Sequence, residues 1–255
     1  MLVTRGAIPK EQHQYFQEHQ SRLISTLTFL GLWDLKNGSV LEIGPFYAYT
    51  PFAYRRQGNE VAVLEGTDPV IEPLIKLYQE EGIRCERLDL LRVLARREDS
   101  SGRLPYADAS FDAVISFETM EHFNFNPVLF ARELHRILKP NGRAFITVPN
   151  QAKLENRRRL FLGQSTRTPI DDYYKFADYN GGDFLGFHWR EYVLREIAEL
   201  FSRSGFTVEK AEHLNSFIDR PGAPLSRRLK RALGRAVIRL VPDAAQNCAV
   251  IARKT

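Results

Sequence analysis

Three short segments early in the chain, of which the first two are apolar, each end in an acidic residue. Glu42 closes the first segment two residues before Gly44, Glu65 follows residues 61–64, and Asp89 follows residues 83–88. Carboxylates at the ends of neighbouring parallel strands lie at one edge of a doubly wound sheet, where such folds bind nucleosides. One acid could accept the hydroxyls of a ribose and another the amino group of a base. The pattern therefore predicts an α/β fold with a nucleoside site at the carboxyl edge of its sheet.

The rest of the chain alternates short apolar strands with helical segments. We expect strands at residues 39–43, 61–64, 84–88, 111–117, 144–148, 206–210 and 248–252. We expect helices at residues 10–30, 51–57, 69–80, 127–138 and 189–204. This alternation is typical of βαβ units and predicts a mainly parallel sheet.

A chain of 255 residues can form one large domain with added segments. We expect a single domain over 1–255, with an N-terminal helical cap over 1–32 and a substrate-side insertion over 151–188. The insertion is polar and aromatic and follows the fifth strand, so it is expected to form a lid or a wall of the substrate site. A basic amphipathic insertion is expected over 220–244, before the last strand.

The net charge of +5 is concentrated in this basic segment, because residues 220–239 contain lysine and arginine but no acid. The remainder is slightly acidic, so we expect no DNA partner. Leu225, Leu229, Leu233 and Val237 share one helical face. This face could pack on the sheet, which we favour, or make weak contact with an anionic membrane over 225–241, or touch nucleic acid phosphates.

Cysteine content and apolar runs limit the class of protein. Cys85 and Cys248 are the two cysteines, and both fall in expected strands, so neither a disulfide scaffold nor a zinc site is indicated. The first twenty residues lack the apolar core of a signal peptide. Apolar runs also fall short of the roughly 20 residues that cross a bilayer. We therefore expect a cytoplasmic protein.

Several short motifs, taken in order, carry a resemblance to a known family. They are 40–44 (VLEIG), Glu65, 87–90 (RLDL), 104–105 (LP) before 110–112 (SFD), Glu121-His122 and 136–142 (RILKPNG). Together they resemble a class I S-adenosylmethionine-dependent methyltransferase over residues 38–150, with a looser match toward the end of the chain. The last motif resembles the small-molecule and glycan methyltransferase branch. The resemblance implies a Rossmann-like seven-stranded sheet whose last strand runs antiparallel.

The resemblance also implies S-adenosyl-L-methionine as the cofactor and assigns roles to residues. Gly44 would let the backbone approach the methionine part of the cofactor. Glu42 would orient this loop or contact the amino-acid end, and Glu65 would hold the ribose. The remaining implied contacts are Asp89 and Leu90 with the adenine, and Phe117 and Glu118 beside the sulfonium and the methyl group.

The chain departs from the family pattern in the loop after the first strand. The family usually has glycines two and four residues after the first one, and here Phe46 and Ala48 occupy these positions. Phenylalanine does not adopt glycine's conformations at low cost, so the loop path is expected to differ. The ring of Phe46 could instead contact the sulfonium through a cation–π interaction.

Two histidines lie where a catalytic base is expected. Methyl transfer to a hydroxyl benefits from a group that accepts the acceptor's proton, and histidine suits this role near neutral pH. His122 follows the fourth strand, and His188 closes the insertion. We identify both as candidate catalytic residues. The alternative is that His122 packs the strand–helix turn and that His188 marks a helix start or hinge.

The spacing of acidic residues is not diagnostic of a metal site, so we expect no metal. If an ion were bound, the candidate ligands would be Glu118, Glu121, Asp171 and Asp172. The insertion also contains Tyr173, Tyr174 and Tyr179, which could stack on a sugar or anchor the lid. Arg157, Arg158 and Arg159 could be solvated or meet an acidic substrate.

We therefore expect a methyltransferase that O-methylates a sugar, a glycan precursor or another polar small molecule. An RNA or protein methyltransferase is the leading rival enzyme, favoured by the basic segment. A degenerate cofactor-binding scaffold is the non-enzyme rival, suggested by Phe46 and Ala48.

Overall fold

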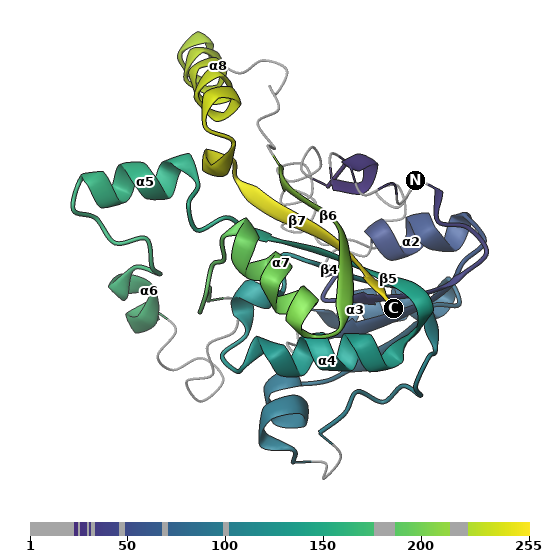
Figure 1. Cartoon of the computed structure of the whole chain (residues 1–255). Coiled ribbons are helices and arrows are strands. Elements are labelled where there is room, and N and C mark those ends of the chain that lie inside the picture. Colours follow the sequence, from purple (N-terminus) through teal and green to yellow (C-terminus); the bar gives the residue numbers. More distant parts are fainter. Residues whose placement is uncertain are drawn as a thin grey trace.

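The computed structural model (Figure 1) describes residues 23–24, 26–29, 31, 34–45, 49–67, 71–98, 102–175, 187–214 and 224–255. Most of the expected N-terminal cap over 1–32 lies outside these residues. Phe46, Ala48 and Tyr179 also lie outside them, as does the middle of the insertion. The predictions made for these positions therefore stay predictions.

The centre of the molecule is a seven-stranded sheet with the strand order β3-β2-β1-β4-β5-β7-β6. Its strands are β1 (Ser39–Ile43), β2 (Glu60–Glu65), β3 (Arg84–Arg87), β4 (Phe111–Phe117), β5 (Leu138–Pro149), β6 (Phe206–Leu214) and β7 (Asn247–Lys254). Strands β1 to β5 pair in parallel, and β7 runs antiparallel to both β5 and β6. The expected Rossmann-like fold with an antiparallel last strand is confirmed.

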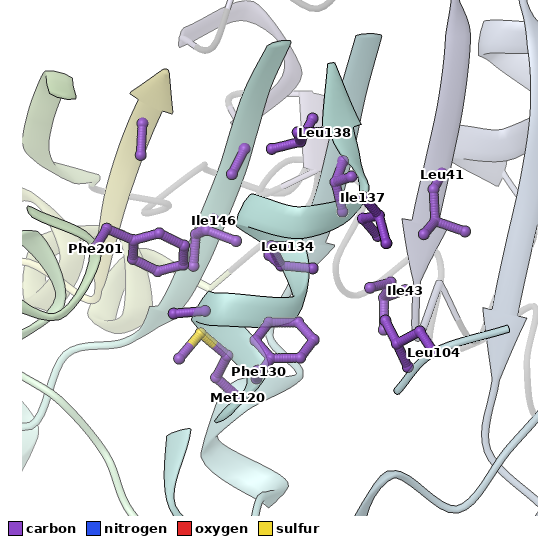
Figure 2. Close-up of a cluster of buried hydrophobic side chains, with 14 of the residues drawn as sticks. Leu41, Ile43, Leu104, Met120, Phe130, Leu134, Ile137, Leu138, Ile146 and Phe201 are labelled. Carbon is purple, nitrogen blue, oxygen red and sulfur yellow. The ribbon is translucent and has the colours of Figure 1, made fainter. Parts of the chain in front are cut away.

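Helices cover both faces of this sheet because successive strand residues point to opposite sides. Val40 and Val63 pack in one cluster with α2 (Tyr49–Arg56) and α3 (Glu72–Glu80). Leu41 and Ile43 pack in the other with α4 (Pro127–Ile137) and α7 (Leu194–Arg203). Figure 2 shows Phe130, Leu134 and Ile137 of α4 facing the sheet, with Phe201 of α7 near Ile146 of β5. Burial on both faces explains why the central strands read as continuous apolar runs.

Two of the motifs that carried the resemblance hold the amino edge of the sheet together. Arg136 donates to the carboxylate of Glu133 and to the carbonyl oxygens of Leu104 and Tyr106. Asp112 accepts from Lys139 Nζ at 2.8 Å and from the backbone N–H of Ser39 at 2.8 Å. These residues lie at the strand ends opposite the expected site, so their role is to stabilise the fold.

Most expected elements form, with shifts at their ends. The helix expected from residue 189 begins at Leu194, where the backbone N–H of Val193 donates to Glu196. The polar stretch 91–103 contains a short π-helix, η4 (Leu91–Arg96). The insertion contains α5 (Leu154–Phe161) and α6 (Ile170–Lys175). A short 3₁₀ turn, η5 (Met120–His122), follows β4, and another, η7 (Pro242–Ala244), follows the basic segment.

The basic segment forms helix α8 (Leu225–Leu240), but its apolar face does not pack on the sheet as we favoured. Leu225, Leu229 and Leu233 are 69%, 61% and 68% exposed. Ile238 is the point of attachment, because it packs with Ala244, Ala245 and Leu154 in a small separate cluster. Figure 1 shows α8 projecting away from the sheet.

Among the helices that the structure describes, none is both long enough and apolar enough to span a membrane.

Candidate functional site

The carboxyl ends of β1, β2 and β3 lie side by side and bring the three expected acids to one edge. Residues 42 and 43 pair with Val63 and Leu64, and the N–H of Gly44 donates to the carbonyl of Leu64 at 2.8 Å. The N–H of Leu88 likewise donates to the carbonyl of Glu65 at 3.0 Å. These backbone bonds set Glu42, Glu65 and Asp89 in neighbouring positions along the edge.

Glu42 is a buried carboxyl group that is only partly hydrogen-bonded. It is 2% exposed, and its Oε1 accepts from the hydroxyl of Thr50 in α2. Its Oε2 is buried and has no hydrogen-bond partner among the described residues. Burial, with a further contribution from the charge of Glu65, raises the pKa of Glu42 to about 8. A cationic group beside Oε2 would satisfy this oxygen and favour its charge.

Gly44 occupies a position where the backbone and its surroundings both require glycine. Its φ is +69°, in the left-handed region. A Cβ at this position would lie 2.9 Å from both Cγ2 and Oγ1 of Thr119. Thr119 is itself fixed, since its hydroxyl is bonded to the carbonyls of Ile43 and Phe117. The loops after β1 and β4 therefore touch at this glycine.

Glu65 and Asp89 differ in their surroundings. Glu65 is 3% exposed and accepts a hydrogen bond from the hydroxyl of Tyr78 at 3.2 Å. The Oδ1 of Asp89 accepts from the N–H groups of Leu91 and Arg92, so it caps η4. Its Oδ2 lies 3.4 Å from Arg92 Nε. From the sequence we favoured a ligand role for Asp89, with helix capping as the alternative, and the structure shows the capping contacts.

An open hollow of about 330 Å³ lies beside Asp89 at the end of β3. Its lining residues are Thr67, Arg87, Leu88, Asp89, Arg92 and Val93. A flat ring entering this hollow would reach the carboxyl edge next to Glu65. Leu90, the expected partner of the base, is half-buried and packs against the core below it.

Phe117 and Glu118 end β4 in the centre of the edge. Glu118 has a φ of +51°, which is uncommon for a residue other than glycine. Its backbone N–H donates to the carbonyl of Thr147, and its Oε2 accepts from Asn247 at 2.7 Å. This side chain therefore contacts the start of β7. Such backbone strain is concentrated at functional sites.

The structure brings together the two histidines that lie far apart in the sequence. The rings of His122 and His188 meet edge to face, with their centroids 5.0 Å apart. His122 Nδ1 lies 3.1 Å from the carbonyl oxygen of Phe187. Burial, and then the proximity of His188, lowers the pKa of His122 to about 4. The His122 ring is therefore neutral at physiological pH.

Glu191 fixes His188 and was missed in the sequence. His188 Nδ1 lies 3.4 Å from Glu191 Oε1, which also accepts from Lys153 at 2.8 Å. Asn156 donates to the other oxygen at 2.7 Å. Burial acts to raise the pKa of Glu191, but the hydrogen bonds from His188 and Lys153 outweigh it, so the pKa falls to about 2. The spacing of an acid three residues after His188 was the available signal.

The insertion is attached to the segment that carries His188. Tyr173 packs its ring against Phe187 at 5.0 Å, and Arg167 donates to the carbonyl of Trp189 at 2.7 Å. Tyr174 is 80% exposed. Arg157, Arg158 and Arg159 are at the surface or half-exposed on α5. The described part of the insertion thus borders the histidine pair.

Of the expected metal ligands, Asp171 and Asp172 lie on α6, where Asp172 pairs with Lys175 at 2.7 Å. Glu121, another of these candidates, lies beside His122 and His188. It is 1% exposed, and its Oε1 is 3.9 Å from His122 Nε2. The site therefore combines three acids at one end of the edge with a carboxylate and two imidazoles at the other.

Comparison with known proteins connects this arrangement to a family. Residues 13–211 match the family model described as a methyltransferase domain. A protein of Mycolicibacterium smegmatis, named "Probable S-adenosylmethionine-dependent methyltransferase", is 29% identical over 113 residues, which cover 44% of this chain and 35% of the relative. A protein of the same description from Mycobacterium tuberculosis is 29% identical over 103 residues, covering 40% of this chain and 29% of the relative. The matched region is thus about a third of the length of these relatives.

Solved structures share the fold across nearly the whole chain. A methyltransferase in complex with the Haloferax volcanii Trm112 activator aligns with a TM-score of 0.61 and 16% identity, covering 97% of this chain and 95% of that one. An S-adenosylmethionine-dependent methyltransferase from Mesorhizobium loti aligns with a TM-score of 0.58 and 17% identity, covering 90% and 98%. A Burkholderia thailandensis 1,6-didemethyltoxoflavin-N1-methyltransferase, solved with S-adenosylhomocysteine, aligns with a TM-score of 0.57 and 14% identity, covering 96% and 83%.

Proposed function

The chain belongs to the class I S-adenosylmethionine-dependent methyltransferases, and we propose that it methylates a hydroxyl group of a sugar, a glycan precursor or a similar polar small molecule. The observation that carries the proposal is the facing pair His122 and His188, beside the carboxyl edge of the sheet and bordered by the insertion. An acceptor hydroxyl bound there loses its proton at a pair of imidazoles.

The residues at the other end of the edge fit S-adenosylmethionine. Bound there, this cofactor supplies a methyl group that is already activated by a positively charged sulfur. The unsatisfied Oε2 of Glu42 suits its cationic amino-acid end, and Gly44 lets that end approach the backbone. Glu65 would hold the ribose hydroxyls, and the adenine would enter the adjacent hollow that Asp89 lines. Leu90 follows Asp89 and is proposed to support the adenine from the core side. Phe117, Glu118 and Phe46 are proposed to lie near the methyl group.

The chain's task in methyl transfer is to align the acceptor, exclude water and receive a proton. The contact of Tyr173 with Phe187 holds the insertion beside the histidine pair, where it would limit the access of water once an acceptor is bound. Glu191 holds His188 in a fixed orientation. The exposed ring of Tyr174 is available to stack on a sugar ring.

Methyl transfer from radiolabelled S-adenosylmethionine tests the proposal directly. The acceptor panel contains sugar nucleotides, lipid-linked sugars, RNA and protein fractions, and Leu160→Ala in α5 serves as a matched control beside His122→Ala and His188→Ala. We expect label in a sugar hydroxyl, lost in both histidine variants while affinity for S-adenosylhomocysteine is kept. Label in RNA or protein would favour the rival enzyme, and absence of S-adenosylhomocysteine binding would favour the scaffold.

We also propose that α8 rests on an anionic membrane surface. Leu225, Leu229 and Leu233 are exposed along one face, and the helix contains lysine and arginine but no acid. Exposed apolar side chains beside basic ones suit the boundary between lipid headgroups and acyl chains. Helix α5, which packs on the base of α8 through Leu154, adds the 90% exposed Phe161.

Co-sedimentation with vesicles of phosphatidylcholine, with or without phosphatidylglycerol, tests this contact. We expect binding to the anionic vesicles that weakens at high salt and is lost in Leu229→Ser/Leu233→Ser and in Arg228→Glu/Lys230→Glu. Arg203→Glu, a single charge reversal on an exposed part of α7, is the control for a change of charge outside α8. Equal binding to neutral vesicles, or burial of the leucines in a dimer of this chain, would overturn the proposal.

A further inference from the structure

Glu121, His122 and His188 form a cluster of ligand atoms. Each residue offers one atom, and within the described part of the chain these atoms lie within 4.8 Å of one another. Glu121 and His122 come from η5, directly after β4, and His188 comes from the end of the insertion. Small side-chain rotations would bring such atoms to the distances of about 2.0–2.2 Å found around zinc.

Each imidazole has its Nδ1 engaged by an acceptor, which leaves Nε2 as the ligand atom. The carbonyl oxygen of Phe187 can only accept, so His122 donates to it from Nδ1 and keeps the lone pair on Nε2. The carboxylate of Glu191 likewise accepts from His188 Nδ1. Metal-binding histidines characteristically donate their other N–H to a carbonyl or carboxylate in this way.

The backbone fixes the two segments against each other. The carbonyl oxygen of Glu121 accepts from the N–H of Trp189 at 2.7 Å and from that of Arg190 at 3.3 Å. Glu191 is anchored in turn by Lys153 and Asn156. The cluster therefore has a rigid outer layer, which an accidental meeting of two surface histidines would lack.

We propose that Glu121, His122 and His188 bind one divalent transition-metal ion. Two imidazoles and a carboxylate suit Zn²⁺, Co²⁺, Fe²⁺ or Mn²⁺, whereas Mg²⁺ and Ca²⁺ favour sets of oxygen ligands. This assignment revises the expectation of a site without metal. Of the candidate ligands named from the sequence, the proposed site keeps Glu121. The two histidines take the place of Glu118, Asp171 and Asp172.

The role of the ion rests on the proposed function. Three protein ligands leave positions open, as in catalytic metal sites. An acceptor hydroxyl in an open position would have a lower pKa, as ion-bound water does. The hydroxyl then gives its proton to solvent, its oxygen forms the bond to the methyl carbon, and the electron pair of the broken carbon–sulfur bond stays on sulfur. In this step His122 and His188 act as ligands, and this role replaces the direct acceptance of the proton by the imidazoles in the proposed function.

The test uses Co²⁺ as the probe, followed by its visible absorption and by calorimetry on the full chain treated with EDTA. We expect one equivalent to bind with a tetrahedral or five-coordinate spectrum, and Zn²⁺ to displace it. Glu121→Gln and His188→Gln should abolish this spectrum. Glu191 contacts the His188 imidazole and is not itself a ligand, so Glu191→Gln should weaken binding about 10- to 100-fold. His135→Gln, on α4, is the matched control and should bind normally.

Measuring S-adenosylhomocysteine affinity in the same metal-free protein separates this inference from the proposed function. Cofactor binding without a Co²⁺ spectrum would overturn the metal site and leave the methyltransferase proposal standing. A spectrum that persists in His188→Gln would also overturn it. Full methyl transfer by metal-free protein in EDTA would overturn the role of the ion in the reaction.

Discussion

Glu42 and Glu65, at the ends of the neighbouring strands β1 and β2, are both buried, and the charge of Glu65 adds to burial in raising the pKa of Glu42 to about 8. Two carboxyl groups so close in a protein interior are costly to ionise together. A cationic ligand between β1 and β4 would reduce that cost. The two buried acids therefore favour a positively charged ligand at this edge of the sheet.

Glu42→Gln should weaken binding of S-adenosylhomocysteine by about 10- to 100-fold, because a hydrogen bond to a charged group contributes roughly 1.5–3 kcal/mol. At pH 7 a carboxyl group with a pKa of about 8 is mostly protonated. A bound ammonium group favours its ionised form, so binding releases protons, and affinity rises as the pH increases toward 8. Calorimetry in buffers of different ionisation enthalpy measures this release. Equal proton release by Glu42→Gln would contradict the assignment.

The same carboxyl group makes the unliganded protein sensitive to pH. Since its pKa is raised from 4.5 to about 8 in the folded state, its contribution to stability is fully present below pH 4.5 and is lost as the pH rises through 8. In Glu42→Gln the side chain cannot ionise, so the variant does not lose stability in this way as the pH rises. Urea unfolding should therefore show the variant gaining stability relative to the wild type between pH 5 and pH 8. A constant difference across this range would show that Glu42 keeps its ordinary pKa.

Gly44→Ala should abolish cofactor binding and lower the free energy of unfolding. A left-handed conformation costs an alanine about 1–2 kcal/mol, and its Cβ would also press on Thr119 at 2.9 Å. Gly163→Ala is the matched control, because Gly163 has a φ of +68° but nothing within 4 Å of the added Cβ. Thermal unfolding and calorimetry would separate the two effects. Equal losses in both variants would rule out the clash with Thr119.

Arg136→Ala should destabilise the protein by about 3–5 kcal/mol, since removing one member of a buried ion pair leaves the other uncompensated. Arg136 is bonded to Glu133, which is 8% exposed, and to two backbone carbonyls. Arg203→Ala, which removes an exposed pair with Glu199, should cost at most about 1 kcal/mol. Chemical denaturation measures both changes. A loss of cofactor affinity in folded Arg136→Ala would contradict its purely structural role.

The central strands β1 and β2 and the acids at their ends could be predicted because strands buried on both faces read as apolar runs that stop where the sheet stops. The positive φ of Gly44 could likewise be anticipated from its place after β1. Contacts between distant segments could not. The approach of Thr119 to Gly44 and the support of His188 by Glu191, Lys153 and Asn156 depend on how the loops meet after folding.

The error on α8 has a physical cause. An amphipathic helix has the same sequence pattern whether its apolar face packs on protein or is left at the surface. The spacing of Leu229 and Leu233 therefore could not show whether they pack against the protein or lie at its surface. Asp89 is a similar case, because a carboxylate after a strand can hold a ligand or cap the next helix, and here it caps η4.

The most direct test of the account is a crystal structure of the protein with S-adenosylhomocysteine. We expect the ribose hydroxyls at hydrogen-bond distance, about 2.5–3.0 Å, from the carboxylate of Glu65, with the adenine in the hollow beside Asp89. A nucleoside bound away from both residues would contradict it.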